Sequence, residues 1–224
     1  MFKKITCFIL SIVIMLSCVP LSFGAVAAED SVKAQLCELV RRFPAGKYWN
    51  HMGSDKNSPD TWTEKPCKSH SGCSWVEDAC SCNSFDKAIQ CMGYAYKIAY
   101  ELVGVSAREF KKSKTLDASK LRVGDVIRYN GHSICVTGVK GKSISFTDCN
   151  YDKKCGIRWG QMKLSEIKKF SYVLHYEKNE MKNDDLDFYV GVEVPDRPIV
   201  VDKKEIWKIL HFTLMTPTKS VLTQ

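Results

Sequence analysis

The spacing of apolar residues changes near the middle of this chain from a helical period to a strand period. From residue 88 to residue 103 apolar side chains recur every three or four positions, and Gly104 follows, so the sequence predicts an amphipathic helix. Four later stretches alternate with a period of two and predict strands: 125–129, 132–139, 143–148 and 171–177. A helix followed by an antiparallel meander predicts an α+β fold, with helices packed on an antiparallel β-sheet.

Two further stretches precede this helix. Residues 31–43 carry apolar side chains at helical spacing and are followed by Pro44, so they predict a short helix. Residues 46–83 have no clear period and are rich in Gly, Ser, Asn, Trp and Cys. They predict a long loop.

The first 27 residues have the composition of a secretory signal peptide. Lys3 and Lys4 precede an apolar run over residues 5–16, and small residues lead to Ala27. The run is shorter than the roughly 20 apolar residues that cross a bilayer as a helix, so we expect cleavage after Ala27 and no integral membrane span. The alternative, a lipoprotein signal at Cys18, is a poorer match. We expect a secreted protein, extracellular or associated with the cell wall.

Loss of this segment changes the formal charge only slightly. Lys3 and Lys4 leave with it and no acidic residue does, so the net charge of +8 falls to +6. Outside a cell a basic protein attracts anionic wall polymers or membrane headgroups, and we expect no nucleic-acid partner. A basic protein without any such partner is the equally simple alternative.

The number of cysteines is odd in the expected mature chain. Of eleven in the sequence, Cys7 and Cys18 belong to the signal segment, which leaves nine. Thiols of exported proteins normally pair, so one is left either for an intermolecular bridge or for chemistry. Cys149 and Cys155 flank a turn and are candidates for one bridge.

Four cysteines are concentrated in the loop before the long helix. They lie within sixteen residues, at Cys67, Cys73, Cys80 and Cys82. Disulfides and a zinc knot are both compatible with such a cluster, but the paired CxxC spacing of zinc ribbons is absent and the expected compartment is oxidising. We therefore expect a disulfide-stapled N-terminal loop, with no metal and no cofactor.

The apolar side chains of two neighbouring strands predict their register. Four of them occupy even-numbered positions: Ile134, Val136, Ile144 and Phe146. They form one apolar face if even-numbered residues pair with even-numbered residues, which a three-residue turn pairing Val139 with Ser143 achieves. We expect the helix at 88–103 to pack on this face.

The same register brings polar side chains together. It sets Ile134 opposite Asp148 and His132 opposite Asn150, on the face that the helix is expected to cover. A buried carboxylate or amide without a partner costs several kcal/mol, so these groups need one, and the imidazole of His132 is the obvious choice. The helix carries Cys91 near its beginning, which predicts a site with a thiol, an imidazole and an acid.

Four motifs in this region resemble those of the CHAP and NlpC/P60 groups of papain-like bacterial hydrolases. In chain order the motifs are Gln90-Cys91 with Gly93-Tyr94-Ala95-Tyr96, Leu121-x-x-Gly124-Asp125-Val126-Ile127, Gly131-His132-Ser133-Ile134-Cys135-Val136, and Asp148-Cys149-Asn150. The resemblance covers residues 83 to about 176. It implies a papain-like fold for this part of the chain.

The resemblance also implies roles for individual residues. Cys91 would attack a carbonyl, His132 would act as its base, and Asp148 would orient the imidazole. Asn150 would support the site, or orient His132 in place of Asp148, because Asp stands here where a Glu is commoner. Gln90 is the expected substrate contact beside Cys91.

Trp159 is a second candidate for substrate binding. Glycines stand close to it in the sequence, at Gly156 and Gly160, so it is expected either to line a substrate cleft or to pack in the core.

These observations divide the chain into a signal peptide (1–27), a helix and cysteine-rich loop (28–83), a CHAP-like catalytic core (84–177) and a charged linker with an accessory tail (178–224). The expected activity is cleavage of amide bonds in peptidoglycan peptides through a thioester, as an endopeptidase or an N-acetylmuramoyl-L-alanine amidase. The alternatives are a secreted cysteine peptidase acting on proteins and a non-catalytic wall-binding module that keeps the fold.

Overall fold

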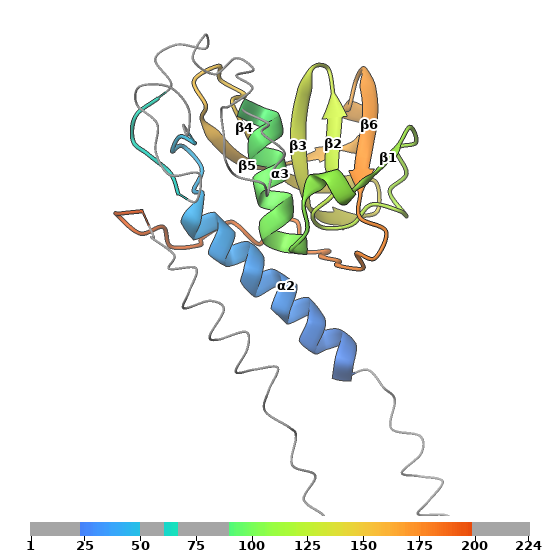
Figure 1. Ribbon diagram of the computed structural model, residues 1–224. Coiled ribbons are helices and arrows are strands. Elements are labelled where there is room, and N and C mark those ends of the chain that lie inside the picture. Colours follow the sequence, from blue (N-terminus) through green and yellow to red (C-terminus); the bar gives the residue numbers. More distant parts are fainter. Residues whose placement is uncertain (1–22, 50–60, 67–89, 199–224) are drawn as a thin grey trace, which may run out of the picture.

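The computed structural model describes residues 23–49, 61–66 and 90–198, which form an α+β fold with two helices and one six-stranded antiparallel sheet (Figure 1). The helices are α2 (Phe23–Arg42) and α3 (Gln90–Val103). The strands are β1 (Lys111–Ser113), β2 (Val126–Tyr129), β3 (His132–Lys140), β4 (Ser143–Cys149), β5 (Ile157–Lys163) and β6 (Phe170–His175), in the order β1-β6-β2-β3-β4-β5. The predicted α+β class with an antiparallel sheet is confirmed.

Several predictions fall outside the described residues. They concern residues 1–22 of the expected signal peptide, the cysteines at 67, 73, 80 and 82, and the tail beyond residue 198. Within the described ranges no disulfide joins two cysteines, and no helix is long and apolar enough to cross a bilayer.

Both ends of α3 are set by local backbone chemistry. Gln90, with φ of 53°, lies in the left-handed region, which an α-helix does not continue through, so the helix begins there. At the other end Gly104 has φ of 78°, and its N–H donates to the carbonyl of Tyr100 at 2.8 Å. Glycine is favoured at such a C-cap because it has no Cβ to clash. Cys91 is therefore in the first turn of α3.

The structure contains two strands that the sequence pattern did not predict. β5 alternates Ile157 and Trp159 toward the core, but Gly160 and the polar residues around it hide the alternation. β1 is three residues long, Lys-Lys-Ser, and forms by pairing with β6 at the edge of the sheet. Lysines on an edge strand discourage pairing with other chains.

The register between β3 and β4 differs from the prediction at the turn and agrees with it near the site. Lys140 pairs with Ser143 through a two-residue turn, so the predicted three-residue turn is wrong. A bulge between Val136 and Gly138 then shifts the register by one residue. Beyond the bulge Val136 pairs with Phe146, which restores the predicted even-to-even pairing.

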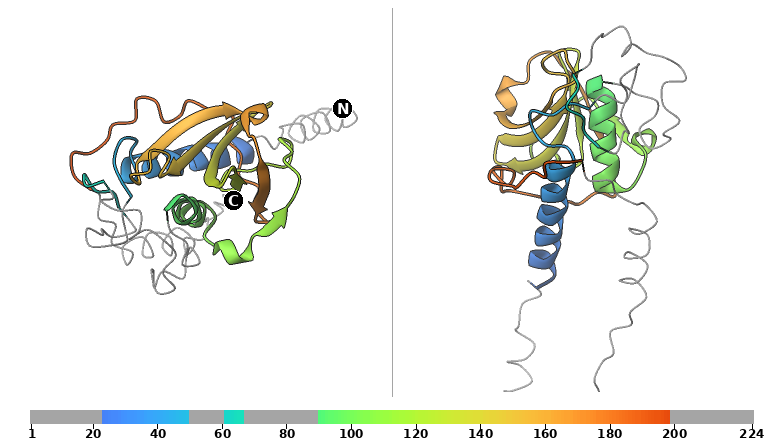
Figure 2. Two further views of the ribbon diagram at one scale, coloured as in Figure 1. Left: turned by 90° about the horizontal axis from the view of Figure 1, so that it is seen from above. Right: turned by 90° about the vertical axis from the view of Figure 1, so that its left-hand side faces the viewer.

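The prediction of which face carries the helix is wrong. The even-numbered apolar residues of β3 and β4 form a separate cluster that loop residues such as Leu121 and Ile167 cover. The apolar side chains of α3 pack instead on the opposite face, against Cys135, Cys149 and their neighbours. Figure 2 shows α3 lying along one side of the sheet.

Small polar side chains explain this difference. The face toward α3 carries buried hydroxyl groups, so its sequence pattern is polar, yet these groups pair with one another and with the helix. Thr137 donates to Ser145 at 3.1 Å, and Thr147 lies 3.0 Å from the hydroxyl of Tyr94 in α3. Small side chains leave room for a helix, whereas isoleucine and phenylalanine fill the other face.

The charged segment after β6 packs against the sheet, although the sequence suggested a linker. From there the chain runs along the end of the sheet toward β5 (Figure 1). Asn179 donates to the carbonyl of Val123 at 2.7 Å, and Asn183 donates to that of Thr137 at 3.0 Å. Further along, Phe188 packs edge-on against Trp159. Residues 177–188 thus form a strap across the end of the sheet opposite His132.

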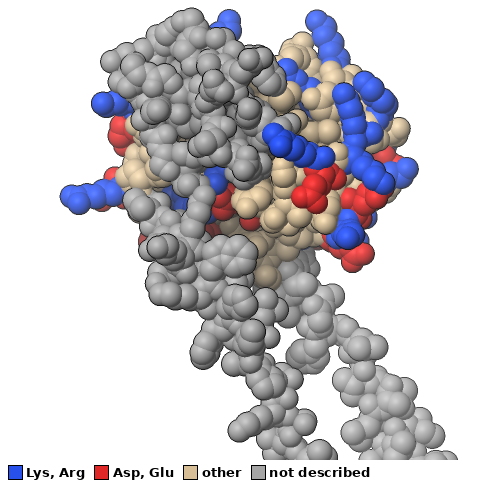
Figure 3. Space-filling view, in the orientation of Figure 1, with Lys and Arg blue, Asp and Glu red and all other residues tan. Residues whose placement is uncertain are grey.

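The outer surface of β1 and β6 is rich in basic side chains. Figure 3 shows Lys and Arg gathered over these two strands. The exposed lysines of this region include Lys111, Lys112 and Lys114.

The strap predicts a large effect of a small substitution at Gly138. A Cβ there would lie 2.6 Å from Ser145 Oγ and 3.0 Å from the carbonyl oxygen of Asn183. We expect Gly138→Ala to lower the free energy of unfolding by about 1–3 kcal/mol, measured by urea denaturation. Gly160→Ala is the control, because its Cβ would meet Phe146 at an ordinary 3.4 Å. Equal stability of the two variants would contradict the strap's tight packing.

Candidate active site

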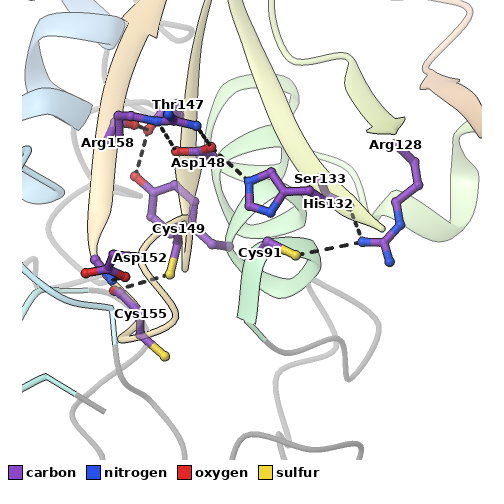
Figure 4. A network of polar contacts seen from close by, with 12 residues as sticks. Cys91, Arg128, His132, Ser133, Thr147, Asp148, Cys149, Asp152, Cys155 and Arg158 are labelled. Carbon is purple, nitrogen blue, oxygen red and sulfur yellow. Dashed lines mark hydrogen bonds and ion pairs between the residues drawn. The ribbon is translucent and has the colours of Figure 1, made fainter. Parts of the chain in front are cut away.

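Three side chains from three different elements meet at one end of the sheet (Figure 4). Cys91 comes from the first turn of α3, His132 is the first residue of β3, and Asp148 lies near the end of β4. The imidazole lies between the carboxylate and the thiol. The structure thus brings together three of the four residues predicted to be catalytic.

A tight turn fixes the position of His132. Asn130 and Gly131 both have positive φ, 47° and 75°, and join β2 to β3. Such two-residue turns match the twist of antiparallel strands, and Asn-Gly is a favoured sequence for them. The turn sets His132 directly opposite Tyr129, whose ring it meets edge-on.

The imidazole is oriented by the acid. Nε2 of His132 donates to Oδ2 of Asp148 at 2.8 Å, so Nδ1 remains for the thiol of Cys91. Asp148 is fully buried, whereas 21% of the His132 side chain is exposed. The acid therefore holds the ring in one orientation at the edge of the solvent.

The charges of this group favour a thiolate beside an imidazolium. Burial raises the pKa of the Cys91 thiol. The hydrogen bond with His132 and the charge of that ring outweigh this effect, so the pKa lies below the ordinary value of a cysteine. Burial lowers the pKa of His132, while its bonds with Asp148 and Cys91 raise it to about 9. A thiolate is the nucleophilic form of cysteine, so this arrangement activates Cys91.

Asp148 has a second partner that the sequence did not reveal. Nε of Arg158 donates to Oδ1 of Asp148 at 3.0 Å, and the neighbouring nitrogen Nη2 donates to Oδ2. Arg158 lies opposite Asp148 in β5 and packs over the rings of Phe146 and Tyr151. The buried carboxylate is therefore neutralised from two sides. Arg158 was missed because the strand that carries it was missed.

Asn150 does not orient His132. Its Nδ2 donates to Oε1 of Gln90 at 3.2 Å, and its Oδ1 accepts the backbone N–H of Cys155 at 3.1 Å. Asn150 thus ties the turn after β4 to the residue before Cys91. Of the two acceptors considered for His132, the geometry selects Asp148.

Arg128 is a further side chain at the site that the sequence did not single out. Its Nη1 lies 3.7 Å from Sγ of Cys91 and 3.0 Å from Oγ of Ser133. Arg128 lies in a predicted strand, two residues before the Asn-Gly turn. This position could have predicted that it pairs with Ser133 across the hairpin. The thiol of Cys91 lies between Arg128 and His132 (Figure 4).

Trp159 lies away from this group. It is buried, its Nε1 donates to the carbonyl of Phe43 at 2.7 Å, and its ring packs against Phe188. Of its two expected roles, the structure supports packing in the core.

The remaining described thiols have different surroundings. Cys149 donates to the carbonyl of Cys155 at 3.4 Å, and no disulfide joins these two candidates for a bridge. Burial raises the pKa of Cys149, and of Cys135 further. Cys91 is therefore a thiol with a lowered pKa beside two with raised pKa values. No group of three His, Cys, Asp or Glu side chains in the described ranges is arranged to hold a metal ion.

A second His–Asp pair lies at the other end of the sheet. Nδ1 of His175 is 2.8 Å from Oδ1 of Asp125, whose other oxygen accepts the backbone N–H of Arg122. Burial raises the pKa of Asp125 to about 6, against the lowering effect of these bonds. The sequence assigned no role to His175, and here it partners a buried acid.

The electrostatics predict selective alkylation of Cys91 in mild acid. Because its pKa is lowered, we expect iodoacetamide at about pH 6 to label Cys91 in the folded protein while Cys135 and Cys149 stay unmodified. Peptide mapping by mass spectrometry measures this. Substitution His132→Ala should abolish the labelling at pH 6 but not at pH 9.5. Equal labelling of both proteins at pH 6 would refute the ion pair.

The geometry also predicts different effects of two neighbouring substitutions. Asp148→Asn removes one of the two negative groups, Asp148 and Cys91, that together raise the pKa of His132 to about 9, so we expect that pKa to fall by about one unit or more. The imidazolium would then be lost as the pH rises through a lower value, and the alkaline limit of Cys91 activation would move down. Asn150→Ala should leave the His132 titration unchanged. NMR titration of the imidazole protons measures both.

Comparison with protein-family models, with curated proteins and with solved structures finds no match to this chain.

Proposed function

We propose that this chain is an exported cysteine hydrolase of papain-like architecture that cleaves an amide bond in peptidoglycan peptides. The observation that carries the proposal is the chain of contacts from Cys91 through His132 to Asp148, at one end of an antiparallel sheet. Its order along the chain, a thiol on a helix and then an imidazole and an acid on strands, is the order in the CHAP-like hydrolases that the sequence resembles.

In the first half of the proposed reaction Cys91 is acylated. The thiolate attacks the carbonyl carbon and forms an S–C bond, while the carbonyl oxygen becomes an oxyanion. The backbone N–H of Cys91, in the first turn of α3, is suited to stabilise this charge. As the C–N bond breaks, the leaving nitrogen takes a proton from Nδ1 of His132, which leaves a thioester.

In the second half of the reaction, water hydrolyses the thioester and releases the carboxylic acid product. His132, now neutral, accepts a proton from a water molecule that attacks the thioester carbonyl. The C–S bond breaks, and Cys91 and His132 return to the thiolate and imidazolium. Asp148 holds the ring in place through both halves, because its bond to Nε2 does not involve the reacting nitrogen.

The choice of substrate rests on the sequence outside the site. The expected signal peptide directs the protein out of the cell, and the remaining charge of +6, after loss of two lysines from +8, suits contact with anionic wall polymers. Outside the cell, where the environment is oxidising, the cysteines at 67, 73, 80 and 82 are proposed to form disulfides.

The proposal predicts that the mature protein hydrolyses amide bonds in purified cell walls. Cys91→Ala should lower the rate by roughly 10³-fold or more, because it removes the nucleophile. Cys37→Ser, a half-buried thiol of α2, is the matched control and should keep the rate. Mass analysis of the released fragments identifies the bond that is cut.

Other outcomes separate the alternatives. Release of protein-derived peptides alone would favour a peptidase acting on proteins. Wall binding without release of fragments, unchanged in Cys91→Ala, would favour a non-catalytic binding module.

A further inference from the structure

Arg128 places a positive charge directly beside the nucleophile. It projects from β2, is partly buried, and contacts the Cys91 sulfur at 3.7 Å through Nη1 (Figure 4). The same nitrogen donates to Ser133 Oγ at 3.0 Å, which fixes the position of the guanidinium. His132 occupies the other side of the sulfur.

No carboxylate in the described part of the chain neutralises Arg128, whose charge acts on Cys91 and helps to lower the pKa of that thiol. No acidic side chain there forms an ion pair with it, and its Nε and Nη2 donate no hydrogen bond to a described residue. The Arg128 side chain is only partly buried, so these two nitrogens remain available to a ligand as far as the described residues are concerned. Arg158 differs, because its Nε and Nη2 both donate to Asp148.

The neighbouring strands extend this positive region away from the thiol. Tyr172 of β6 lies opposite Arg128, and Nζ of Lys112 is 4.1 Å from the centre of its ring. Lys114 follows, with its ammonium on the carbonyl of Ser171. None of these lysines pairs with an acid among the described residues. Lys and Arg side chains gather over β1 and β6 in Figure 3.

The distances limit which part of a substrate Arg128 can reach. A carbonyl carbon about to be attacked lies about 3–3.5 Å from the sulfur. A carboxylate oxygen bound to the guanidinium lies about 2.8 Å from its nitrogen. Since Nη1 is itself 3.7 Å from Sγ, both groups must belong to the same or to adjacent residues of the substrate.

We propose that Arg128 binds a carboxylate of the substrate, so that this hydrolase selects amide bonds flanked by an acidic group. The proposal rests on the proposed function in that Cys91 is the nucleophile. A guanidinium presents two parallel N–H donors that match the two oxygens of a carboxylate, and Nε and Nη2 of Arg128 are the pair that has no partner among the described residues. The nearby lysines guide anionic ligands toward this position.

A pair of small alkylating reagents tests the carboxylate site without any substrate. Iodoacetate and iodoacetamide differ by one carboxylate in place of one amide, and with either reagent the Cys91 thiolate forms an S–C bond and releases iodide. We expect Arg128→Gln to lower the ratio of the two rates at Cys91, iodoacetate over iodoacetamide, by about 10-fold or more, as loss of a hydrogen bond between charged groups implies. Whole-protein mass spectrometry with peptide mapping measures both rates.

Two further variants separate local binding from a general effect of charge. Lys112→Gln removes one charge from the same face, and we expect it to change the ratio less than about twofold, since an exposed charge acts weakly at this range. Arg128→Lys keeps the charge without the paired donors and should give an intermediate ratio. An unchanged ratio in Arg128→Gln, or an equal fall in Lys112→Gln, would overturn the proposal. The iodoacetamide rate itself reports whether each variant keeps an active thiol.

A second measurement uses the substrate. Once the cleaved bond is known from wall fragments, two synthetic peptides are compared, with a carboxylate or a carboxamide beside that bond. The wild type should prefer the acid in kcat/KM by about 10-fold or more, and Arg128→Gln should lose the preference. Hydrolysis of both peptides at equal kcat/KM would refute the carboxylate site and still support the proposed hydrolase function. An Arg128-dependent alkylation ratio in a protein that hydrolyses nothing would support the anion site and refute the hydrolase.

Discussion

The buried carboxylate of Asp148 is the constraint on which the rest of the site depends. An ionised group with no access to water costs several kcal/mol unless the protein neutralises it. Its strand lies between β3 and β5, and each neighbour supplies a cation, His132 from one side and Arg158 from the other. The orientation of the imidazole toward Cys91 is thus a by-product of satisfying the acid. The contacts that orient His132 are therefore the same contacts that stabilise the buried acid in the sheet.

Part of this site follows from one simple pattern in the sequence. The even-numbered apolar residues of β3 and β4 place His132 near Asp148, and the structure has that pairing beyond the bulge. The face of the sheet that α3 covers was predicted wrongly, because the apolar pattern reflects the polarity of side chains and not their size. Hydroxyl groups such as Thr147 are buried on the helix side, where Tyr94 satisfies them. A polar pattern can therefore belong to a dry interface when its groups are small and paired.

The arginines show a different limit of sequence patterns. Arg158 belongs to a strand whose alternation is broken by glycine and polar residues, so neither the strand nor its side chain was predicted. Arg128 lies in a predicted strand, but its importance comes from Cys91, which reaches it from a helix on the same face. Contacts between a helix and a strand distant in sequence depend on the crossing of the two elements, and no period in the sequence encodes that crossing.

The hairpin between β3 and β4 contains two irregularities that cancel. A turn one residue shorter than the apolar pattern requires is offset by one extra residue at the bulge, so His132 still reaches Asp148. A longer turn with a regular strand would use the same number of residues and give the same site. For an evolving chain the two forms are interchangeable at the end of the sheet that carries His132, while at the other end they differ in the position of the strap. Insertions and deletions in this hairpin should therefore occur as compensated pairs. The number of residues in the hairpin should vary less than the positions of its turn and its bulge.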